Sequence, residues 1–525
     1  MAKGLLRATA GVSAMTLISR VLGFVRDMVI ARMFGAGTAA DAFFVAFRIP
    51  NLLRRITAEG AFSQAFVPVL SDVRSRSAEG DVQHLVERVA GTLFGILGVI
   101  TCIGVVAAPL LIMAFAPGFV HQAGKFELAA AMLRVTFPYI LFISLSALAG
   151  AILNSYGRFT VPALMPAFLN LSLIGSALWL APRLEEPIMA LAWGTFLGGI
   201  LQLVLQFPAL YRLGLLRRPR WGWRDPAVRR VLALMLPVIF SASVSQVNLL
   251  LNTIIASFMA TGSVSWLYYS DRLVELPLGV IGVALGTVIL PSLSRSAAQR
   301  SPQEFSQTLD WGLRWVMLIG VPATLGLMML SGPVLATLFY HGEFTRHDLD
   351  MATYSLITYS FGLLSFMQVK VLAPGFYARQ DTRTPMRFAL VSIAVNMGFN
   401  LLVVVPMIVY AVPAPHAALA LATSLAGYVN VWQLHRALRR QGAYQPAPGW
   451  RRLGLQMLIA NGAMALLLLL AVPGLDQWAA WNTTTRALNL GAWIGAAFAV
   501  YVITLRLTGI NLAALLGRQR RAGGQ

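Results

Sequence analysis

The sequence predicts an all-α protein that crosses a membrane many times. Hydrophobic residues make up 58% of its 525 residues and charged residues only 12%, with a mean hydropathy of +0.71. An ordinary soluble domain is about 25% charged. The apolar residues are gathered into runs long enough to cross a bilayer, which takes about 20 residues each. This composition excludes a soluble globular protein.

Fourteen membrane spans are expected from these runs. The first has a basic start but is longer than a signal-peptide core and lacks a convincing cleavage site, so we expect it to stay uncleaved. The second is expected to bend at Pro50, which lacks a backbone donor, and to continue as a partly amphipathic stretch to about Ser71. The spans are 8–32, 37–57, 89–114, 130–154, 160–181, 188–211, 232–260, 264–290, 312–340, 352–377, 386–411, 416–436, 453–473 and 486–508.

The positive charges between the spans lie almost entirely on one side of the membrane. Twenty-five arginine and lysine residues fall on that side, against four on the other, which are Arg32, Lys125, Arg183 and Arg346. Loops rich in arginine and lysine stay in the cytoplasm, so both termini are expected to be cytoplasmic. The net charge of +21 belongs to these short loops, and no soluble basic domain for nucleic acid is present.

A weak internal repeat divides most of the chain into two halves. Residues 19–21 (Ser-Arg-Val) match residues 245–247 (Ser-Gln-Val) at an offset of 226, and Pro109 matches Pro333 at an offset of 224. Two further proline motifs match at nearly the same offset. Shared membrane composition is the alternative explanation, but four matches at nearly one offset favour a duplication. Six spans per repeat give parallel halves, as in transporters that bind substrate between their repeats.

The repeat predicts three parts of the chain. An N-terminal lobe covers 1–220, a C-terminal lobe covers 221–441, and residues 442–525 hold spans 13 and 14 and a basic tail. Spans 13 and 14 lie outside the repeat. They are either extra packing helices or the walls of a lipid-facing groove.

Charged residues inside the spans are the strongest indication of function. Each charge near the middle of a membrane helix costs roughly 2.5–3.5 kcal/mol on insertion scales. A chain with many such charges is therefore expected to turn them toward a shared polar interior. The first two spans and the segment after them carry most of the charges, and spans 8 and 10 carry the rest: Arg20, Arg26, Asp27, Arg32, Asp41, Arg48, Arg54, Arg55 and Glu59, then Asp271, Arg272, Glu275 and Lys370.

Asp271 and Glu275 are four residues apart, so they share a helix face, with Arg272 beside them. For these two acids, a local set of ion pairs that only braces span 8 is the alternative to a role in the polar interior. For Arg272 and Lys370 the polar interior is favoured.

Several kinds of site are missing from the sequence. It contains no GxxxxGK[ST] phosphate loop, no segment long enough for a nucleotide-binding domain and no cluster of metal-ligand residues. We therefore expect no cofactor. The energy source is left to an ion gradient, the membrane potential or the substrate gradient, with the coupling ion unknown.

Four segments resemble the MurJ/MviN family within the multidrug/oligosaccharidyl-lipid/polysaccharide exporter superfamily. They are 19–27 (SRVLGFVRD), 34–69, 261–277 and 369–385 (VKVLAPGFYARQDTRTP), and the resemblance covers nearly the whole chain. Members of this family are the lipid II flippases of bacterial peptidoglycan synthesis. The resemblance implies two six-helix lobes around a central cationic cavity, and a groove formed by spans 13 and 14 for the polyprenyl tail.

The resemblance also implies a substrate-binding set. Carried over at matching positions, its members are Arg20, Arg26, Asp41, Arg54, Arg55, Glu59, Arg272 and Lys370, with Ser19, Asn51, Gln246, Asp271 and Glu275 as weaker candidates. Lipid II carries a diphosphate and an acidic peptide, and the planar fork of arginine suits phosphate oxygens.

The expected function is the movement of lipid II from the inner to the outer leaflet of the bacterial inner membrane by alternating access. This involves no covalent change and hence no enzyme activity. The expected partners are lipid II and membrane lipids, without nucleic acid, and the protein is expected to act as a monomer. Two other functions stay open: export of another polyprenyl-linked glycan or of drugs, and glycosyl transfer or ligation. The many arginines argue against cationic drugs, and the short outer loops argue against an enzyme.

Overall fold

The computed structural model describes residues 2–56, 62–76 and 79–510, and every regular element in these residues is a helix. The all-α prediction is therefore confirmed. The described residues form two compact units. The first runs to Ser265 and takes in Gly342–Phe344, and the second comprises Trp266–His341 and the chain from Thr345 onward.

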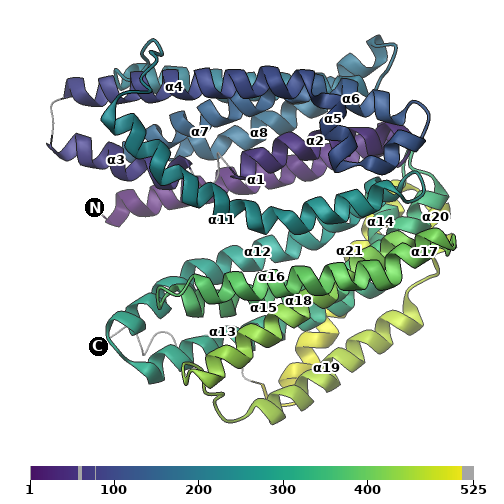
Figure 1. Ribbon diagram of the computed structural model, residues 1–525. Helices are drawn as coiled ribbons and strands as arrows, with labels where there is room; N and C mark the ends of the chain where they lie inside the picture. Colours follow the sequence, from purple (N-terminus) through teal and green to yellow (C-terminus); the bar gives the residue numbers. More distant parts are fainter. Residues whose placement is uncertain (1, 57–61, 77–78, 511–525) are drawn as a thin grey trace. The chain divides into compact units, whose positions relative to one another are not determined.

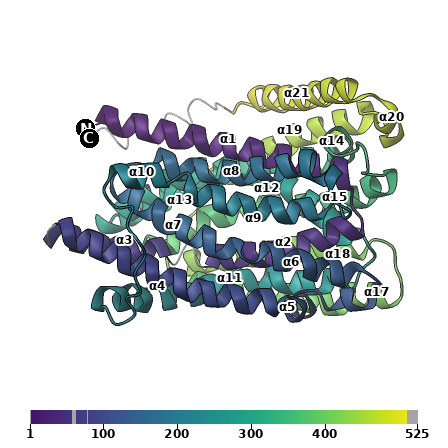
Figure 2. The ribbon, with the colours of Figure 1, turned by 90° about the horizontal axis from the view of Figure 1, so that it is seen from above.

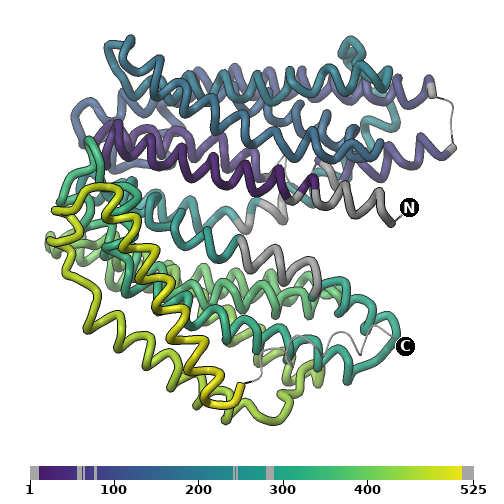
Figure 3. Tube along the Cα trace, turned by 180° about the vertical axis from the view of Figure 1, so that it is seen from behind, coloured from purple at the N-terminus to yellow at the C-terminus, as the bar shows by residue number. Residues whose placement is uncertain are grey.

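The long helices of the first unit run roughly along one direction (Figures 1 and 3). Helix α1 packs on α8, α8 and α7 pack on α9, α2 packs on α6, and α11 packs on α3. The elements are α1 (Ala2–Phe34), α2 (Thr38–Ile56), α3 (Phe62–Arg76), α4 (Glu79–Val106), α5 (Ala108–Phe115), η2 (Pro117–His121), α6 (Lys125–Thr136), α7 (Tyr139–Ser155), α8 (Thr160–Gly175), η3 (Ser176–Leu180), η4 (Ala181–Arg183), α9 (Met189–Val204), α10 (Phe207–Arg212) and α11 (Pro226–Ser257).

In the second unit, α15 lies at the centre of the packing, against α13 and α18, and α16 packs on α18. The C-terminal helices α19 and α21 lie side by side and appear in yellow tones in Figure 2. The elements are α12 (Ser263–Ala298), α13 (Pro302–Met329), α14 (Ser331–Leu338), α15 (Arg346–Tyr377), α16 (Arg383–Phe399), η5 (Asn400–Val404), α17 (Val405–Val409), α18 (Pro415–Arg440), α19 (Trp450–Ala471), α20 (Leu475–Ala480) and α21 (Thr483–Leu507).

Nine helical segments in the described part of the chain are long and apolar enough to cross a membrane. The five other predicted spans coincide with α1, α2, α11, α12 and α18, which are helical as well. The count of fourteen stays a prediction. The nine segments are Gly80–Val106, Lys125–Ser155, Thr160–Arg183, Met189–Arg212, Pro302–Met329, Arg346–Tyr377, Arg383–Val409, Trp450–Ala471 and Thr483–Leu507.

The predicted lobes and the compact units have different boundaries. The lobes meet between residues 220 and 221, whereas the first unit extends to Ser265 because α11 packs against α2, α3 and α4. The lobes are defined by sequence repetition and the units by packing, so the lobe boundary stays a prediction. Helix α2 continues through Pro50 to Ile56. The stretch expected to run on to about Ser71 first crosses residues 57–61, which lie outside the described part, and is then helical in α3.

A rare backbone feature recurs at the offset of the sequence repeat. A π-helical segment, η3, follows α8, and a second, η5, follows α16. Their first residues, Ser176 and Asn400, are 224 positions apart, the same offset as Pro109 and Pro333. Because π-helical turns are uncommon, their recurrence at this offset is independent support for a duplication.

Two glycines fix the turn between α1 and α2. Gly35 has φ +61°, a conformation that side chains disfavour, and a Cβ there would overlap the carbonyl oxygen of Glu343. Gly342 also has φ +61°, and a Cβ on it would overlap the carbonyl oxygen of Arg32. The Glu343 amide donates to that Arg32 carbonyl at 2.9 Å. This close backbone contact explains why Gly342–Phe344 packs with the first unit.

Candidate functional site

Arg26 is buried between α1 and α8 and is held by two polar side chains. Its Nε and Nη2 donate to Asp27 Oδ1 at 2.9 and 2.7 Å, and its Nη1 donates to Asn170 Oδ1 at 3.0 Å. Arg26 and Asp27 are only 7% and 2% exposed. A buried guanidinium needs such a carboxylate and a further acceptor, because its desolvation is expensive. In this structure Arg26 fastens α1 to α8.

Arg20 differs from Arg26 because its side chain is exposed. Six residues separate the two arginines, so on a helix they point about 120° apart. Ser19 is half-buried beside Arg20, and its backbone carbonyl accepts from Asn170 Nδ2 at 3.0 Å. Of the two arginines, Arg20 is the one whose charge is open to a ligand.

Asp41 is fully buried and accepts four hydrogen bonds from three residues of the first unit. Lys125 Nζ and the Gly262 amide donate to Oδ2, each at 2.8 Å. The Ser265 amide and hydroxyl donate to Oδ1 at 2.9 and 2.6 Å. Asp41 and Lys125 are each 1% exposed. The carboxylate therefore joins α2 to α6 and to the start of α12, and a substrate group would have to displace one of these donors.

The C-terminal part of α2 carries three arginines in different settings. Arg54 is half-buried, and its Nε donates to Asn51 Oδ1 at 2.8 Å, while Arg55 is exposed. Arg48, which was not among the predicted site residues, donates from Nη1 to Thr253 Oγ1 of α11 at 2.7 Å. Glu59 lies outside the described residues.

The predicted residues of α12 and α15 have exposed or half-buried side chains. Arg272 Nη1 pairs with Glu275 Oε2 at 2.7 Å, with side chains 27% and 42% exposed, and its guanidinium lies 5.0 Å from the centre of the Tyr268 ring. Asp271 and Lys370 are exposed. The local ion pairing considered for the acids of this helix is thus present for Glu275. In the first unit, Gln246 is half-buried on α11.

Two further polar clusters hold the C-terminal helices, and sequence reasoning did not find either. Buried Arg486 of α21 donates to four backbone carbonyls at 2.7 to 3.0 Å, those of Trp478, Ala479, Ala336 and Tyr340. These carbonyls lie at the C-terminal ends of α20 and α14, where the helix dipole favours a cation. The residues are up to 150 positions apart, so no local pattern identifies them.

Asp310 of α13 organises the loop between α18 and α19. Its carboxylate accepts from Arg314 Nε at 2.7 Å, from Trp450 Nε1 at 2.7 Å and from the Tyr444 hydroxyl at 3.0 Å. Burial, and then the Asp310 carboxylate, raise the pKa of Tyr444 above its ordinary value. The hydroxyl therefore stays protonated, and keeps donating this bond, to a higher pH than an ordinary tyrosine would.

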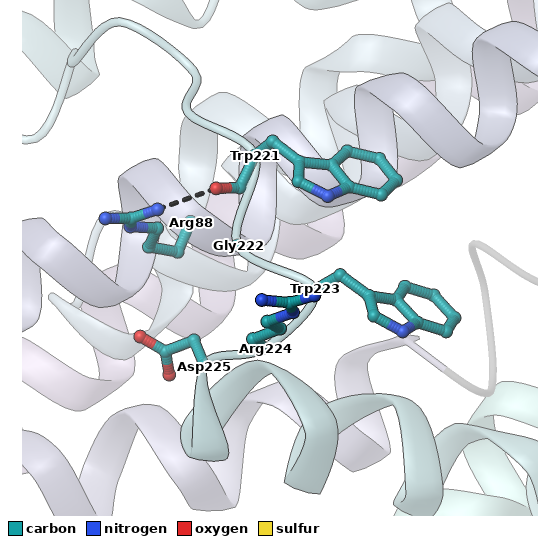
Figure 4. A pocket seen from close by; sticks show the side chains of 6 residues that line it. All are labelled: Arg88, Trp221, Gly222, Trp223, Arg224 and Asp225. Carbon is teal, nitrogen blue, oxygen red and sulfur yellow. Dashed lines mark hydrogen bonds between the residues drawn. The ribbon is translucent and has the colours of Figure 1, made fainter.

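A cavity of about 860 Å³ lies elsewhere in the first unit, between α4 and the loop that precedes α11 (Figure 4). Its lining contains no predicted site residue. Arg88 Nη1 donates to the Trp221 carbonyl at 2.6 Å. The indole rings of Trp221 and Trp223 stack with their centroids 6.3 Å apart and an 11° angle between their planes. We call the cavity and its lining, Arg88 and residues 221–225, the loop cavity.

Among the predicted site residues that the structure describes, more cations than acids have exposed or half-buried side chains. Arg20, Arg55 and Lys370 are exposed, and Arg54 and Arg272 are half-buried. Such groups bind phosphate or carboxylate oxygens. Among the described residues, no group of three or more His, Cys, Asp or Glu side chains could hold a metal ion.

Comparisons with known proteins agree on one family. A family model described as "Lipid II flippase MurJ" matches residues 30–489. A probable lipid II flippase MurJ from Vibrio cholerae serotype O1 is 46% identical over 519 residues, which covers 98% of each chain. A probable lipid II flippase MurJ from Haemophilus influenzae is 44% identical over 515 residues, covering 96% of this chain and 99% of its own.

Solved structures show the same relationship. The structure titled "Lipid II flippase MurJ, inward closed conformation" superposes with a TM-score of 0.77 at 25% identity, covering 97% of this chain and 99% of its own. An inward-facing MATE family multidrug transporter of the MOP superfamily has a TM-score of 0.61 at 13% identity, with 82% and 99% covered, which shows a shared fold alone. The family and the multi-pass membrane architecture predicted from the sequence are confirmed: this chain belongs to the lipid II flippase MurJ family.

Proposed function

We propose that this protein is a lipid II flippase, which moves undecaprenyl-diphosphate-linked peptidoglycan precursor from the inner to the outer leaflet of the cytoplasmic membrane. The observation that carries the proposal is the family match over residues 30–489, together with relatives of the same name that align along nearly their whole length. The carrier works by alternating access and makes no covalent change in its substrate. It needs no cofactor for this, and the coupling ion is left open.

The substrate's negative charges are proposed to bind cations whose side chains are exposed or half-buried. Arg20, Arg55, Arg272 and Lys370 are exposed or half-buried, so they are available to the diphosphate and the acidic peptide. Arg54, held by Asn51, is a further contact. Arg26 and Asp41 act differently, because each is buried with protein partners and sets the position of the helices around it. Glu59 completes the proposed set.

The protein is proposed to lie in the inner membrane of a bacterium with both termini in the cytoplasm. The excess of arginine and lysine on one side of the predicted spans supports this orientation. A single chain is the proposed unit of transport, since each chain carries both repeats. The helices α19 and α21, which lie outside the repeat, expose rows of leucine and isoleucine that suit contact with a lipid tail.

A reconstituted translocation assay tests the function. The purified protein is placed in liposomes that carry labelled lipid II, another undecaprenyl-diphosphate-linked glycan or a cationic drug, and movement of each across the bilayer is timed. Lipid II should cross faster than in protein-free liposomes, and the drug should not. Rapid transport of the other glycan without lipid II would overturn the proposal in favour of a sibling exporter.

A further inference from the structure

On one side of the loop cavity, the loop before α11 lies directly against α4. Its arginines and aromatic rings therefore occupy different positions along this helix. Gly91 and Gly95 let the loop lie on this helix, because a Cβ on Gly91 would overlap the backbone of Arg220 and a Cβ on Gly95 would overlap the Trp221 ring. The Arg220 amide donates to the Glu87 carbonyl at 3.0 Å, and the Gly222 amide donates to Thr92 Oγ1 at 3.1 Å. The loop is therefore fixed to the helix by its backbone.

The position of this contact along α4 matters. Arg88 is the last charged residue before an uncharged stretch, 89–106, that belongs to a candidate membrane span. Gly95, under the Trp221 ring, lies seven residues further on, which is about 10 Å toward the apolar part at 1.5 Å per residue. Figure 4 shows both indoles projecting to the same side of the loop, with the Arg88 guanidinium on the other side.

The exposed groups of the loop cavity are of two kinds, aromatic and cationic. Trp221 and Trp223 are 57% and 49% exposed although they stack on each other, and tryptophan favours the boundary between headgroups and acyl chains. Arg224 is exposed next to them. The lining acid, Asp225, is engaged, because its Oδ1 accepts from the Ala227 amide at 2.9 Å as the N-cap of α11.

The loop also carries a strong positive charge. Between the end of α10 and Asp225 it contains four arginines and no acid: Arg217, Arg218, Arg220 and Arg224. Next to it, the exposed face of α4 is apolar, with Phe94, Val99 and Ile103 each more than half exposed. A cationic loop beside exposed aromatic rings and an apolar helix face complements an amphiphile with an anionic head.

We propose that the loop cavity binds the headgroup of an anionic glycerophospholipid, such as phosphatidylglycerol. The phosphate oxygens accept hydrogen bonds from Arg224, the charge of Arg88 adds to the attraction, and the glycerol and upper acyl chains pack on the indoles of Trp221 and Trp223. The site is separate from the residues proposed to bind lipid II. It would tie the long loop before α11 to the surrounding bilayer.

The test is native mass spectrometry of the full-length, delipidated protein, titrated with phosphatidylglycerol or with phosphatidylethanolamine of the same acyl chains. The wild type should bind phosphatidylglycerol more tightly. Arg224→Gln should weaken that binding about fivefold, the effect of one basic residue near a membrane surface. Arg158→Gln, which changes another exposed arginine on the same predicted side, is the matched control and should bind as the wild type does.

A second variant and a soluble anion separate the possible occupants. Trp223→Ala should weaken binding of phosphatidylglycerol, because the glycerol and acyl chains lose a ring to pack on, while millimolar inorganic phosphate should not displace the lipid. Displacement by phosphate would assign the site to a soluble anion. Equal binding of the two lipids by the wild type, or unchanged phosphatidylglycerol binding by both Arg224→Gln and Trp223→Ala, would overturn the proposal.

Discussion

Two arginines of α1 illustrate how burial separates roles that the sequence cannot. Arg20 and Arg26 belong to one motif and were expected to line the same polar interior. Arg26 is 7% exposed and saturated by Asp27 and Asn170, whereas Arg20 is exposed. A charge with no buried partner can be removed with little loss of stability, whereas removing a charge that has buried partners lowers the stability of the fold.

This difference makes a prediction for Arg20. Arg20→Ala should abolish lipid II transport in proteoliposomes while leaving the melting temperature and the amount of membrane-inserted protein unchanged. Arg20→Lys should restore only part of the activity, because lysine keeps the charge but loses the planar fork. Arg26→Ala serves as the comparison and should lower the melting temperature as well, since it leaves Asp27 buried without this partner. Normal transport by Arg20→Ala would remove this residue from the substrate site.

A second prediction concerns the Asp41–Lys125 pair. Asp41→Asn leaves the Lys125 ammonium buried without its carboxylate, and breaking a buried pair typically costs about 3–5 kcal/mol. The melting temperature of the purified protein should therefore fall strongly. Asp41→Asn combined with Lys125→Met should recover part of the loss, because no uncompensated charge remains.

The matched control for this pair is Asp476→Asn. Asp476 also pairs with a cation, Arg346, at 2.9 Å, but its side chain is 95% exposed. Exposed pairs contribute little to stability, so this change should barely move the melting temperature. If both aspartates proved equally tolerant, the four donors around Asp41 would not be holding α2, α6 and the start of α12 together.

The candidate site residues were named from the sequence and stay predictions, whereas the partners of their charges could not be named from it. Charged residues in apolar runs are conspicuous, which is why Arg20, Arg26, Asp41, Arg272 and Lys370 were identified. The sequence places Lys125 in an outer loop, yet it is the buried partner of Asp41, 84 positions away. A hydropathy pattern identifies a charged residue within an apolar run. It does not identify the residue that pairs with this charge, because the partner is set by how the helices pack.

At the scale of the element, the helices followed from hydropathy and their irregularities did not. All fourteen predicted spans coincide with helices because a run of apolar residues long enough to span a bilayer must satisfy its backbone internally. The π-helical segments η3 and η5 carry no signature of that kind. The loop cavity was also missed, since its floor depends on glycines of α4 that resemble any other small residues in a span.

The turn between α1 and α2 yields a prediction at this scale. Gly35→Ala adds a Cβ at a positive φ and against the Glu343 backbone, so it should lower the melting temperature. Gly37, two residues later, has open space at its Cβ position and no positive φ. Gly37→Ala should therefore be neutral. An unchanged melting temperature for both substitutions would show that the contact with Gly342–Phe344 contributes nothing to stability.

At the scale of the whole molecule, the orientation in the membrane can be tested by labelling. In a Cys102→Ser background, cysteines near Thr261 and His341 should react with an impermeant maleimide added outside intact cells, and cysteines near Trp221 and Ala443 should not. The expectation rests on the strong bias of arginine and lysine between the predicted spans. Labelling near Trp221 from outside would reverse the orientation and disprove the span count.

The last prediction concerns the driving force. An anionic headgroup that leaves a negative cell interior gains about 2.3 kcal/mol per charge per 100 mV. Two uncompensated charges thus gain about 4.6 kcal/mol, which is roughly a thousandfold in an equilibrium constant. If the exposed and half-buried arginines neutralise the substrate instead, the empty carrier has the net positive charge, and the same field favours its inward-facing state.

Both routes make transport depend on the membrane potential. Collapsing the potential with a potassium ionophore, while buffers hold the proton gradient constant, should slow the flipping of labelled lipid II in proteoliposomes. Arg272→Gln or Lys370→Gln should alter the steepness of that dependence, because each removes one of the charges that either route moves through the field. Undiminished flipping at zero potential would leave only an ion coupled to the carrier, or exchange down the gradient of the substrate itself, to drive the cycle.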